Sequence, residues 1–455
     1  MLNHLKTYFK GKKILILGFG IEGKSTFRLI RMLFPEMKIC IADEKACIEH
    51  FEILKNDKNI QLQTGNNYLE GLSDFDIIIK TPGISPEKIG ITDFSKFTSH
   101  TELFFRFFRN QIIGITGTKG KSTTSSLIHH IISSWSPNCQ LAGNIGIPPF
   151  DLIDKINKDT LIVYELSSHQ LEQTRISPKT AVFLNLYEEH LDHYKSFDTY
   201  QQAKFSITRF QEEADNLIYN ADDERIVELL YKAGIKRNFW RYSLKNEVTK
   251  GCYLKEKTLI FKAAEKEIQT YKTGFNNLPG VHNLQNIMAA ICAGYIAEIP
   301  AEKMINAIKA FKPLEHRMEY AGTFNDIIFY NDSIATIPEA AVAAISTLKN
   351  VNTLILGGYD RGVSYDPFVD YLEKTNIENV ILIDTAGKRL HEIFQKKNYH
   401  SKKIFYFDDF ENAVITAKKV TTPHKICLLS PAAASYGMFK NFEERGTLFK
   451  KLIRL

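Results

Sequence analysis

The sequence predicts an α/β protein made of three successive domains. Two glycine-rich loops, about 100 residues apart, each follow a short apolar run and precede a helix-forming stretch. Strand-like apolar runs then alternate with helical stretches as far as the C-terminus, and 455 residues are enough for about three domains. We expect a Rossmann-like domain at residues 1–108, a central P-loop ATPase-like domain at 109–312 and a C-terminal Rossmann-like domain at 313–455.

The first glycine loop, at residues 18–23, has the spacing G-x-G-x-x-G. It lies between a predicted strand at 14–17 and a predicted helix at 24–34. The next strand, 38–43, ends in Asp43, about 20 residues after the third glycine. This arrangement is typical of nucleotide binding, with glycines for the close approach of phosphate and an acid for a sugar or base. The alternative is a βαβ unit that binds no nucleotide.

A third strand, predicted at residues 75–80, runs into the turn Thr81-Pro82-Gly83. Proline and glycine make such a turn rigid, and α/β sheets place ligands at the carboxyl ends of their strands. Residues 1–108 are therefore predicted to form one nucleotide-binding domain.

The second glycine loop follows a predicted buried strand at 112–115 and opens a helix that continues to residue 133. Strand, loop and helix N-terminus together form a phosphate-binding device, in which Lys121 neutralises phosphate charge and the Ser122 hydroxyl reaches Mg²⁺. The common nucleotide-binding pattern has glycine where this chain has Ile115. The alternative is a chance glycine-rich turn. The residues expected to contact the nucleotide are Gly117, Thr118, Lys119, Gly120, Lys121, Ser122 and Thr123.

Three more residues of the central domain stand near predicted strand ends or on a helix. A strand at 161–164 delivers Glu165 to its carboxyl end, where an acid is well placed to hold Mg²⁺. The strand at 181–186 is followed by His190, which taken alone is more often a structural histidine. Lys204 lies on a predicted helix and, taken alone, indicates only a solvated lysine.

The rest of the central domain is less informative. Asn144 supplies a polar amide in a glycine-rich turn, and residues 215–275 are predicted to alternate short strands and turns without clear chemistry. Asn283 and Asn286 stand three residues apart near the start of an apolar helix. Two interpretations are open for this pair: the amides cap the helix, or they face the edge of a base.

The third domain is predicted to begin after Lys312-Pro313 and the segment that contains Arg317. Its strands are predicted at 326–333, 352–358, 379–384 and 425–430. Asp332 stands in the first of these strands, Arg361 follows the second, and Ser435 follows the fourth. Small residues around Ser435 allow a ligand to approach the backbone closely.

Composition excludes several classes of protein. The net charge of +6 is spread along the chain with no long Lys/Arg block, which argues against a nucleic-acid partner. No apolar run approaches 18 residues and the N-terminus lacks a signal peptide, so we expect no membrane association. Six scattered cysteines without a C-x-x-C pair indicate neither a disulfide framework nor a zinc site. We expect a cytoplasmic protein that is a monomer.

The motifs, taken in order, resemble those of the Mur ligases of peptidoglycan synthesis, most of all the type that adds D-glutamate. The resemblance covers nearly the whole chain and rests on GTKGKST, GNIG, ELSSHQLE, EEHLDHY with AKFSI, PGVHNLQN, HRME, FYNDSIAT, LGGYDRG and LSPAAASYGMFKNFEERG. It implies ATP-driven addition of D-glutamate to UDP-N-acetylmuramoyl-L-alanine through an acyl phosphate. Because water would destroy an acyl phosphate, we also expect the third domain to close over the site on a hinge near residues 312–315.

The resemblance also implies roles for individual residues. The first domain would bind the UDP-muramoyl substrate rather than NAD, through Gly18, Asp43, Thr81 and Gly83, with Asn144 on the muramoyl peptide. Adenine would face Asn283 and Asn286, and Arg317 and Asp332 would reach the ATP phosphates and ribose. One Mg²⁺ would be held by Ser122 and Glu165 and a second by His190, with Lys204 modified to a carbamate. The expected catalytic residues are Lys121, Lys204 and His190, and the incoming amino acid would be surrounded by Arg361, Ser435 and Phe442.

Two departures from the family pattern leave alternatives open. Ile334 stands where the family usually has lysine. Arg361 stands where the family often has lysine, but arginine is a known variant there and can still bind a carboxylate. The isoleucine leaves the identity or the chirality of the added amino acid open, because a related subgroup adds L-glutamate.

Other functions fit the sequence less well. A folylpolyglutamate synthase would lack the first domain, and the Mur ligase that adds a diamino acid carries a D-N-P-R motif that is absent here. A nucleotide sensor has no need of Glu165, His190 and Lys204 together. An NAD oxidoreductase leaves the second glycine loop unexplained.

Overall fold

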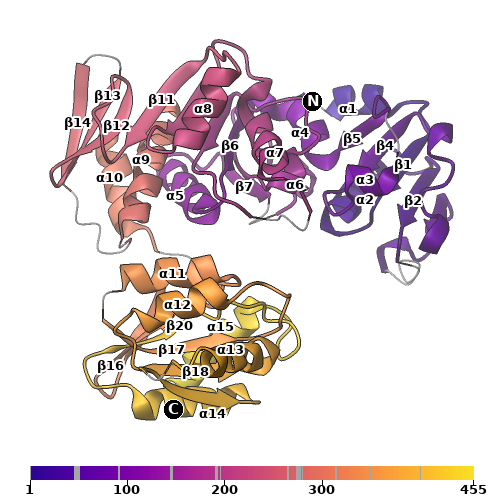
Figure 1. The fold of residues 1–455 in the computed structure, drawn as a ribbon. Helices are drawn as coiled ribbons and strands as arrows, with labels where there is room; N and C mark the ends of the chain where they lie inside the picture. Colours follow the sequence, from indigo (N-terminus) through magenta and orange to yellow (C-terminus); the bar gives the residue numbers. More distant parts are fainter. Residues whose placement is uncertain are drawn as a thin grey trace. The chain divides into compact units, whose positions relative to one another are not determined.

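The chain divides into two compact units in the computed structural model (Figure 1). The first comprises Met1–Asn276 and His282–Phe311, and the second comprises Asn277–Val281 and Lys312–Leu455. The described residues are 2–455 except 46–51, 91–92, 144–146, 190–192, 195, 264–265, 273–277, 279, 313–314, 349 and 400. The predicted residues Asn144 and His190 therefore lie outside the described part of the chain.

The first unit begins with a sheet of five parallel strands in the order β3-β2-β1-β4-β5. Its strands are β1 (Ile14–Leu17), β2 (Ile39–Asp43), β3 (Ile60–Thr64), β4 (Ile77–Lys80) and β5 (Phe97–Ser99). Its helices are α1 (Leu2–Phe9), α2 (Ile21–Leu33), α3 (Pro86–Ile89) and α4 (His100–Phe108). The four residues of β1 are all apolar and buried, as expected for a central parallel strand. Because β4 returns to pair with β1, the ends of these two strands meet at the switch point of the sheet.

The second sheet of the first unit has nine strands in the order β14-β13-β12-β11-β10-β9-β6-β8-β7. They are β6 (Ile112–Thr116), β7 (Cys139–Gly143), β8 (Leu161–Glu165), β9 (Thr180–Phe183), β10 (Asn216–Asn220), β11 (Asn238–Ser243), β12 (Gly251–Lys255), β13 (Thr258–Ala263) and β14 (Lys266–Lys272). The helices are α5 (Lys121–Ser133), α6 (Ser168–Leu171), α7 (Phe197–Arg209), α8 (Glu224–Lys232), α9 (Val281–Ile296) and α10 (Ala301–Ala310). Because β6 pairs with both β8 and β9, the carboxyl ends of these three strands lie together.

The second unit contains a sheet of six strands in the order β15-β16-β20-β17-β18-β19, in which only the edge strand β15 is antiparallel to its neighbour. The strands are β15 (Glu319–Phe324), β16 (Ile327–Asn331), β17 (Val351–Gly357), β18 (Asn379–Ile383), β19 (Lys403–Phe407) and β20 (Ile426–Leu429). The helices are α11 (Pro338–Thr347), α12 (Asp366–Glu373), α13 (Asp384–Lys396), α14 (Phe410–Val420) and α15 (Phe442–Leu452).

The three sheets confirm the predicted α/β class, with two differences in detail. The strand expected at 181–186 ends at Phe183. Beyond it the chain follows the glycine loop between β6 and α5, the phosphate loop of the sequence prediction, and Asn185 O accepts from Thr118 N–H of that loop. The stretch 215–275, predicted as strands and turns only, contains the helix α8. That helix is amphipathic and starts at the N-cap Asp223, so its periodicity was readable in the sequence.

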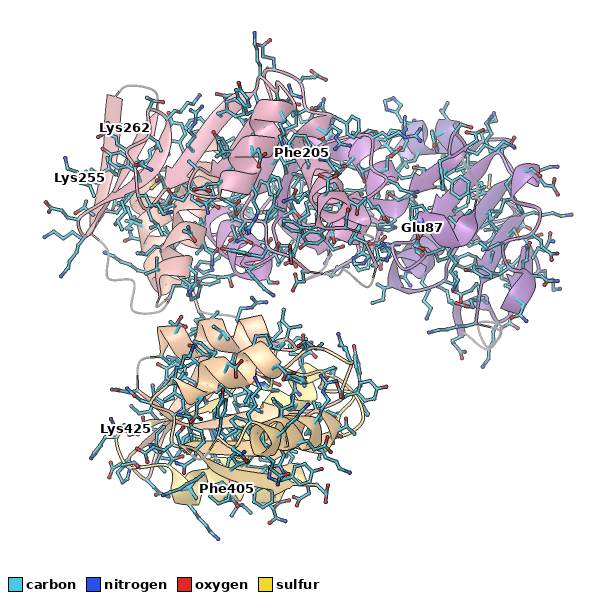
Figure 2. The ribbon with its side chains drawn as sticks, in the orientation of Figure 1. Glu87, Phe205, Lys255, Lys262, Phe405 and Lys425 are labelled. Atoms are coloured by element: carbon cyan, nitrogen blue, oxygen red, sulfur yellow. The ribbon has the colours of Figure 1, made fainter. Side chains whose placement is uncertain are left out.

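The two sheets of the first unit share one apolar core. The core includes Phe27 from α2, Phe104 from α4, Tyr164 from β8 and Phe205 from α7. Phe205 is labelled in Figure 2. Polar contacts add to it, since the hydroxyls of Thr101 and Tyr164 lie 3.2 Å apart. Shared packing of this kind positions the two glycine loops within one body.

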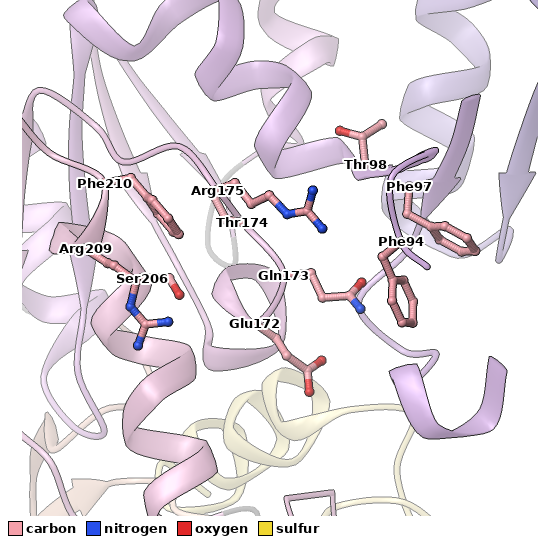
Figure 3. A pocket seen from close by; sticks show the side chains of 10 residues that line it. All are labelled: Phe94, Phe97, Thr98, Glu172, Gln173, Thr174, Arg175, Ser206, Arg209 and Phe210. Carbon is pink, nitrogen blue, oxygen red and sulfur yellow. The ribbon is translucent and has the colours of Figure 1, made fainter. Parts of the chain in front are cut away.

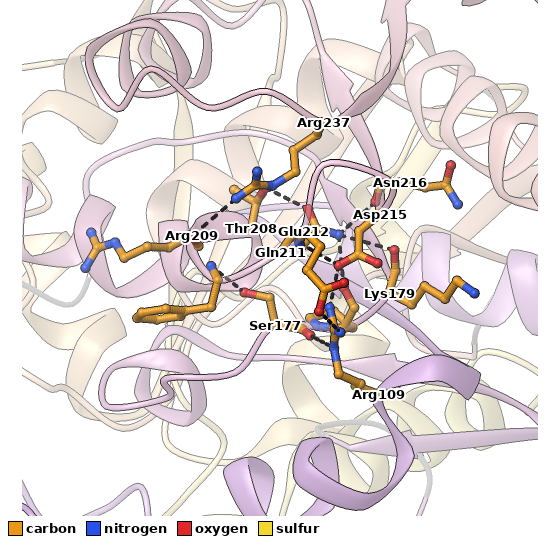
Figure 4. Close-up of polar contacts among 12 residues, drawn as sticks. Arg109, Ser177, Lys179, Thr208, Arg209, Gln211, Glu212, Asp215, Asn216 and Arg237 are labelled. Carbon is orange, nitrogen blue, oxygen red and sulfur yellow. Dashed lines mark hydrogen bonds and ion pairs between the residues drawn. The ribbon is translucent and has the colours of Figure 1, made fainter.

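A polar network holds the amino-terminal edge of the central sheet (Figure 4). Arg109 donates to Ser177 O at 3.2 Å and to Glu212 Oε1 at 2.9 Å, and it also pairs with Asp215. These residues stand just before β6, β9 and β10. The network therefore connects the amino-terminal ends of β6, β9 and β10, whereas the phosphate loop follows the carboxyl end of β6.

Two further features concern long apolar helices and cysteines. Within the described ranges, no helix combines the length and apolarity that a bilayer-spanning segment requires. Five cysteines are buried as free thiols: Cys40, Cys139, Cys252, Cys292 and Cys427.

Candidate functional site

The second glycine loop joins β6 to the N-terminus of α5, as the sequence predicts. Gly120 has φ +84°, a conformation that favours glycine, and a Cβ there would lie 2.6 Å from Asn286 Oδ1. The first N–H groups of a helix have no partner within the helix, and they carry its positive end. The 13-residue helix α5 therefore directs this end at the loop, which is the arrangement that binds phosphate.

Two lysines converge on one carbonyl of this loop. Lys121 Nζ donates to Gly117 O at 2.8 Å and to Thr118 O at 2.9 Å. Lys204 Nζ, on α7, donates to the same Gly117 O at 2.9 Å. Lys204 is only 2% exposed, so it is not the solvated lysine that its helix alone suggests. Burial, followed by the charge of Lys121, holds the pKa of Lys204 well below its ordinary value.

Ser122 and Glu165 lie together beside the loop. Ser122 Oγ donates to Glu165 Oε1 at 3.3 Å, and Glu165 is fully buried at the end of β8. A hydroxyl and a carboxylate are oxygen donors of the kind that Mg²⁺ prefers, so these two residues fit the predicted ion. Within the described ranges, no three His, Cys, Asp or Glu side chains gather as a ready-made metal site.

Asn185 is a residue of this site that the sequence analysis did not single out. Its Oδ1 accepts from Lys119 N–H at 2.8 Å, its Nδ2 donates to Lys119 O at 3.0 Å, and its backbone O accepts from Thr118 N–H at 3.0 Å. Tyr200 OH lies 3.0 Å from Thr118 Oγ1. The sequence carried one signal for Asn185: it is a polar residue that follows closely after β9, a strand that pairs with β6.

Asn286 packs directly against the phosphate loop. Its Oδ1 accepts from Thr124 Oγ1 at 3.1 Å, and its Nδ2 donates to Asn283 Oδ1 at 3.1 Å. Both asparagines are buried. The pair thus connects α9 to α5, and contact with adenine stays a prediction.

The first glycine loop lies at the switch point of the five-stranded sheet. A Cβ on Gly18, which has φ +94°, would lie 2.0 Å from Thr81 Oγ1, so the ends of β1 and β4 touch. Asp43 Oδ2 accepts from Phe19 N–H at 2.7 Å and fixes the loop from the end of β2. Gly83 is close by in sequence and has open space around its Cα. Gly18, Asp43 and Thr81 are thus brought together as predicted, while their contact with uridine diphosphate stays a prediction.

In the second unit, Asp332 lies at the end of β16 and is 4% exposed. Its Oδ1 accepts from Met318 N–H at 3.1 Å and its Oδ2 from Ser430 Oγ at 2.8 Å. Burial raises the pKa of Asp332 to about 7, against the hydrogen bonds and the charge of Arg317. Asp332 therefore ties β16 to β20, next to Arg317.

The residues predicted to surround the amino acid occupy the same edge of the third sheet. Arg361 lies over the ring of Tyr436, with its Cζ 5.7 Å from the ring centroid, and Ser435 is buried. Phe442 begins α15, and its carbonyl accepts from Ser333 Oγ at 2.8 Å.

Arg445 organises this edge and was not singled out from the sequence. It is 0% exposed, and its guanidinium donates to Ser333 O at 2.8 Å, Ser333 Oγ at 3.1 Å and Ala433 O at 3.2 Å. It also reaches Ala434 O at 3.3 Å and Gly357 O at 3.5 Å. Arg445 thus gathers the chain after β16, β17 and β20. The motif N-F-E-x-R-G was visible in the sequence, but the acceptors of its arginine were not.

A pocket of about 270 Å³ lies between β5 and the α6–α7 region (Figure 3). Phe94, Phe97 and Phe210 supply apolar walls, and Arg175 and Arg209 supply charge. Of the predicted site residues that the structure describes, none lines this pocket.

Comparison with known proteins identifies the family. A family model described as the Mur ligase middle domain matches residues 115–294, and one described as the Mur ligase, glutamate ligase domain matches residues 316–433. The UDP-N-acetylmuramoylalanine--D-glutamate ligase of Acetivibrio thermocellus is 33% identical over 465 residues, which cover 99% of this chain and 98% of that protein. The chain belongs to the Mur ligase family.

Other relatives support the assignment of this chain to the Mur ligase family. The protein of the same name from Clostridium kluyveri is 34% identical over 459 residues, with 98% of each chain covered. The solved structure of the MurF ligase from Thermotoga maritima in complex with ADP has a TM-score of 0.61 at 16% identity, covering 97% of this chain and 95% of that one. A pseudomurein peptide ligase type C from Methanothermus fervidus has a TM-score of 0.59 at 16% identity, covering 98% and 99%. The fold is that of the Mur ligases, and the protein is an ATP-dependent ligase.

Proposed function

We propose that this Mur ligase adds D-glutamate to UDP-N-acetylmuramoyl-L-alanine at the expense of ATP. We assign the acceptor to residues 1–108, the nucleotide to 109–312 and the amino acid to 313–455. The observation that carries the proposal is the convergence of Lys121, Lys204 and the Ser122–Glu165 pair on one phosphate loop. The choice of acceptor and amino acid is supported by relatives named for that reaction over their whole length.

The first step joins the acceptor to phosphate. A carboxylate oxygen of the acceptor bonds to the γ-phosphorus of ATP, the bond from that phosphorus to the ADP oxygen breaks, and an acyl phosphate and ADP result. Lys121, now held by two loop carbonyls, turns to the phosphoryl oxygens and offsets their charge. Asn185 keeps the loop in shape during this step, because its amide bonds both the N–H and the carbonyl of Lys119.

The second step forms the amide. The amine nitrogen of glutamate bonds to the acyl carbon and loses a proton, and inorganic phosphate leaves. Arg361 is the proposed partner of a glutamate carboxylate, since a guanidinium binds a carboxylate through two parallel hydrogen bonds. Arg445 supports this subsite by holding the backbone just before Ser435.

The predicted ions would be held by Ser122 with Glu165 and by His190. When bound, Mg²⁺ supplies positive charge to the phosphoryl oxygens. Lys204 is the proposed site of a carbamate, in which its amine nitrogen bonds to CO₂ and loses a proton. Three lysines surround one loop: Lys119, Lys121 and Lys204. Formation of the carbamate on Lys204 replaces the positive charge of one of them by a negative charge.

A second candidate reaction is the addition of L-glutamate to the same acceptor. It is favoured by Ile334, which stands in the chain after β16 where the family usually has lysine. Its N–H donates to His316 O at 3.1 Å, and two residues before it Asp332 ties β16 to β20. The apolar side chain removes one positive charge from the proposed amino-acid subsite.

The test is release of phosphate from ATP in the presence of UDP-N-acetylmuramoyl-L-alanine and either D- or L-glutamate. We expect turnover with D-glutamate. Turnover with L-glutamate alone would select the second candidate, and the Ile334→Lys variant would then be tested for restored use of D-glutamate. No turnover with either enantiomer would refute both.

A further inference from the structure

Glu22 is a partly buried acid that the proposed reaction does not yet use. It stands in the first turn of α2, inside the first glycine loop, and its side chain points toward the segment after β8. Its Oε1 accepts from Gln170 Nε2 at 2.6 Å. Its Oε2 is shielded from solvent and has no hydrogen-bond partner among the described residues. A buried carboxyl oxygen in this state is costly, so its presence calls for an explanation.

Gln170 connects Glu22 to the phosphate loop. Its Oε1 accepts from Ser167 N–H at 2.8 Å and from Ser167 Oγ at 3.1 Å, which completes the capping box of α6. Ser167 follows Glu165 by two residues, and Glu165 in turn accepts from Ser122 Oγ. A short path of hydrogen bonds and backbone therefore runs from the first glycine loop to the second.

The charges around Glu22 come from three elements. Lys80, at the end of β4, is 3% exposed and donates to Ile84 O at 2.6 Å, and its ammonium acts on both Glu22 and Glu172. Tyr164 on β8 and His100 on α4 complete the surroundings.

Glu22 changes charge near neutral pH. Burial raises the pKa of Glu22 to about 7, with Gln170 and Lys80 opposing it. Burial raises the pKa of Tyr164 and lowers the pKa of His100 to about 3, so both are neutral at pH 7. Burial also lowers the pKa of Lys80.

We propose that Glu22 is a positioning residue that holds the acceptor loop in register with the β8–α6 segment through Gln170, and that its uncharged form is the one that admits the anionic acceptor. The inference rests on the proposed function. The N-terminus of α2 attracts an anion, and an ionised carboxylate in its first turn competes with the diphosphate of the acceptor. Acceptor binding and protonation of Glu22 thus favour each other.

The test is the pH dependence of KM for UDP-N-acetylmuramoyl-L-alanine, measured by phosphate release between pH 6.0 and 8.5. In the wild type we expect KM to rise about 3- to 10-fold over this range. Glu22→Gln should keep the low KM at every pH, because its amide oxygen still accepts from Gln170 and it carries no charge. Glu70→Gln, at an exposed position of the same domain, should follow the wild type.

A second variant separates position from charge. Gln170→Ala should raise KM and lower kcat at all pH values, and it should move the rise of KM to higher pH, because Gln170 opposes the raised pKa of Glu22. The inference is overturned if Glu22→Gln retains the wild-type pH slope, or if Gln170→Ala matches the wild type in both constants. No turnover by the wild type at any pH refutes the proposed function and this inference with it.

Discussion

The buried Arg445 offers the sharpest prediction of stability in the second unit. The Arg445→Met variant keeps most of the side-chain volume but removes every donor. Ser333 O, Ser333 Oγ and Ala433 O, now bonded at 2.8, 3.1 and 3.2 Å, then lose their partner in a site that is 0% exposed. Replacing a buried charge together with its partners can be neutral, but here two backbone carbonyls and the Ser333 hydroxyl stay behind.

The magnitude follows from these three acceptors. An orphaned buried acceptor costs about 1–3 kcal/mol, and neighbouring losses are not additive, so we expect a loss of about 3–5 kcal/mol. Burial lowers the pKa of Arg445 to about 9, so the fold holds this charge against a desolvation cost. For a unit of this size, the loss corresponds to a fall in Tm of about 10 °C.

The assay is thermal unfolding followed by circular dichroism, with Arg454→Met as the matched control. Arg454 is exposed near the C-terminus, so the control should shift Tm by less than about 2 °C. A shift for Arg445→Met no larger than that of the control would refute the reasoning, since water would then have replaced the guanidinium. Arg445→Lys should fall between the two, because one ammonium cannot reach acceptors on three segments.

Four further predictions concern the site. Lys121→Ala should lower kcat about 10³-fold, measured by phosphate release. Near-normal turnover would show that the ATP site lies elsewhere. Lys204→Ala should abolish activity, and added acetate should partly restore it; full activity without acetate would exclude the carbamate. Gly120→Ala should impair nucleotide binding measured by calorimetry, because its Cβ would lie 2.6 Å from Asn286 Oδ1 at φ +84°, and unchanged affinity would contradict this clash. The pKa of Asp332 is raised in the fold to about 7, so its contribution to stability falls as pH rises from about 4 to 7. Asp332→Asn should therefore gain in Tm relative to the wild type over that window, and a constant difference would argue against the shift.

Much of the fold was predictable because its signals are local. Short apolar runs such as 14–17 and 112–116 are strands buried on both faces, and such runs need no distant information to recognise. The phosphate loop was equally local, since β6, the left-handed Gly120 and the start of α5 are consecutive in the chain. Even the meeting of Gly18 with Thr81 follows from strand order, because strand ends on one edge of a parallel sheet are neighbours.

The sequence by itself therefore determined the three α/β sheets, the resemblance to the family and the glycine loop between β6 and α5. Only the tertiary structure decided which polar side chains complete the site. Lys204 resembles a solvated helix lysine in the sequence, but α7 packs it beside the phosphate loop. Asn185, Gln170 and Arg445 have their hydrogen-bond partners on other segments of the chain. The physical reason is that a buried polar group must be satisfied wherever the fold brings a partner, and that partner is not encoded by any local period of the sequence.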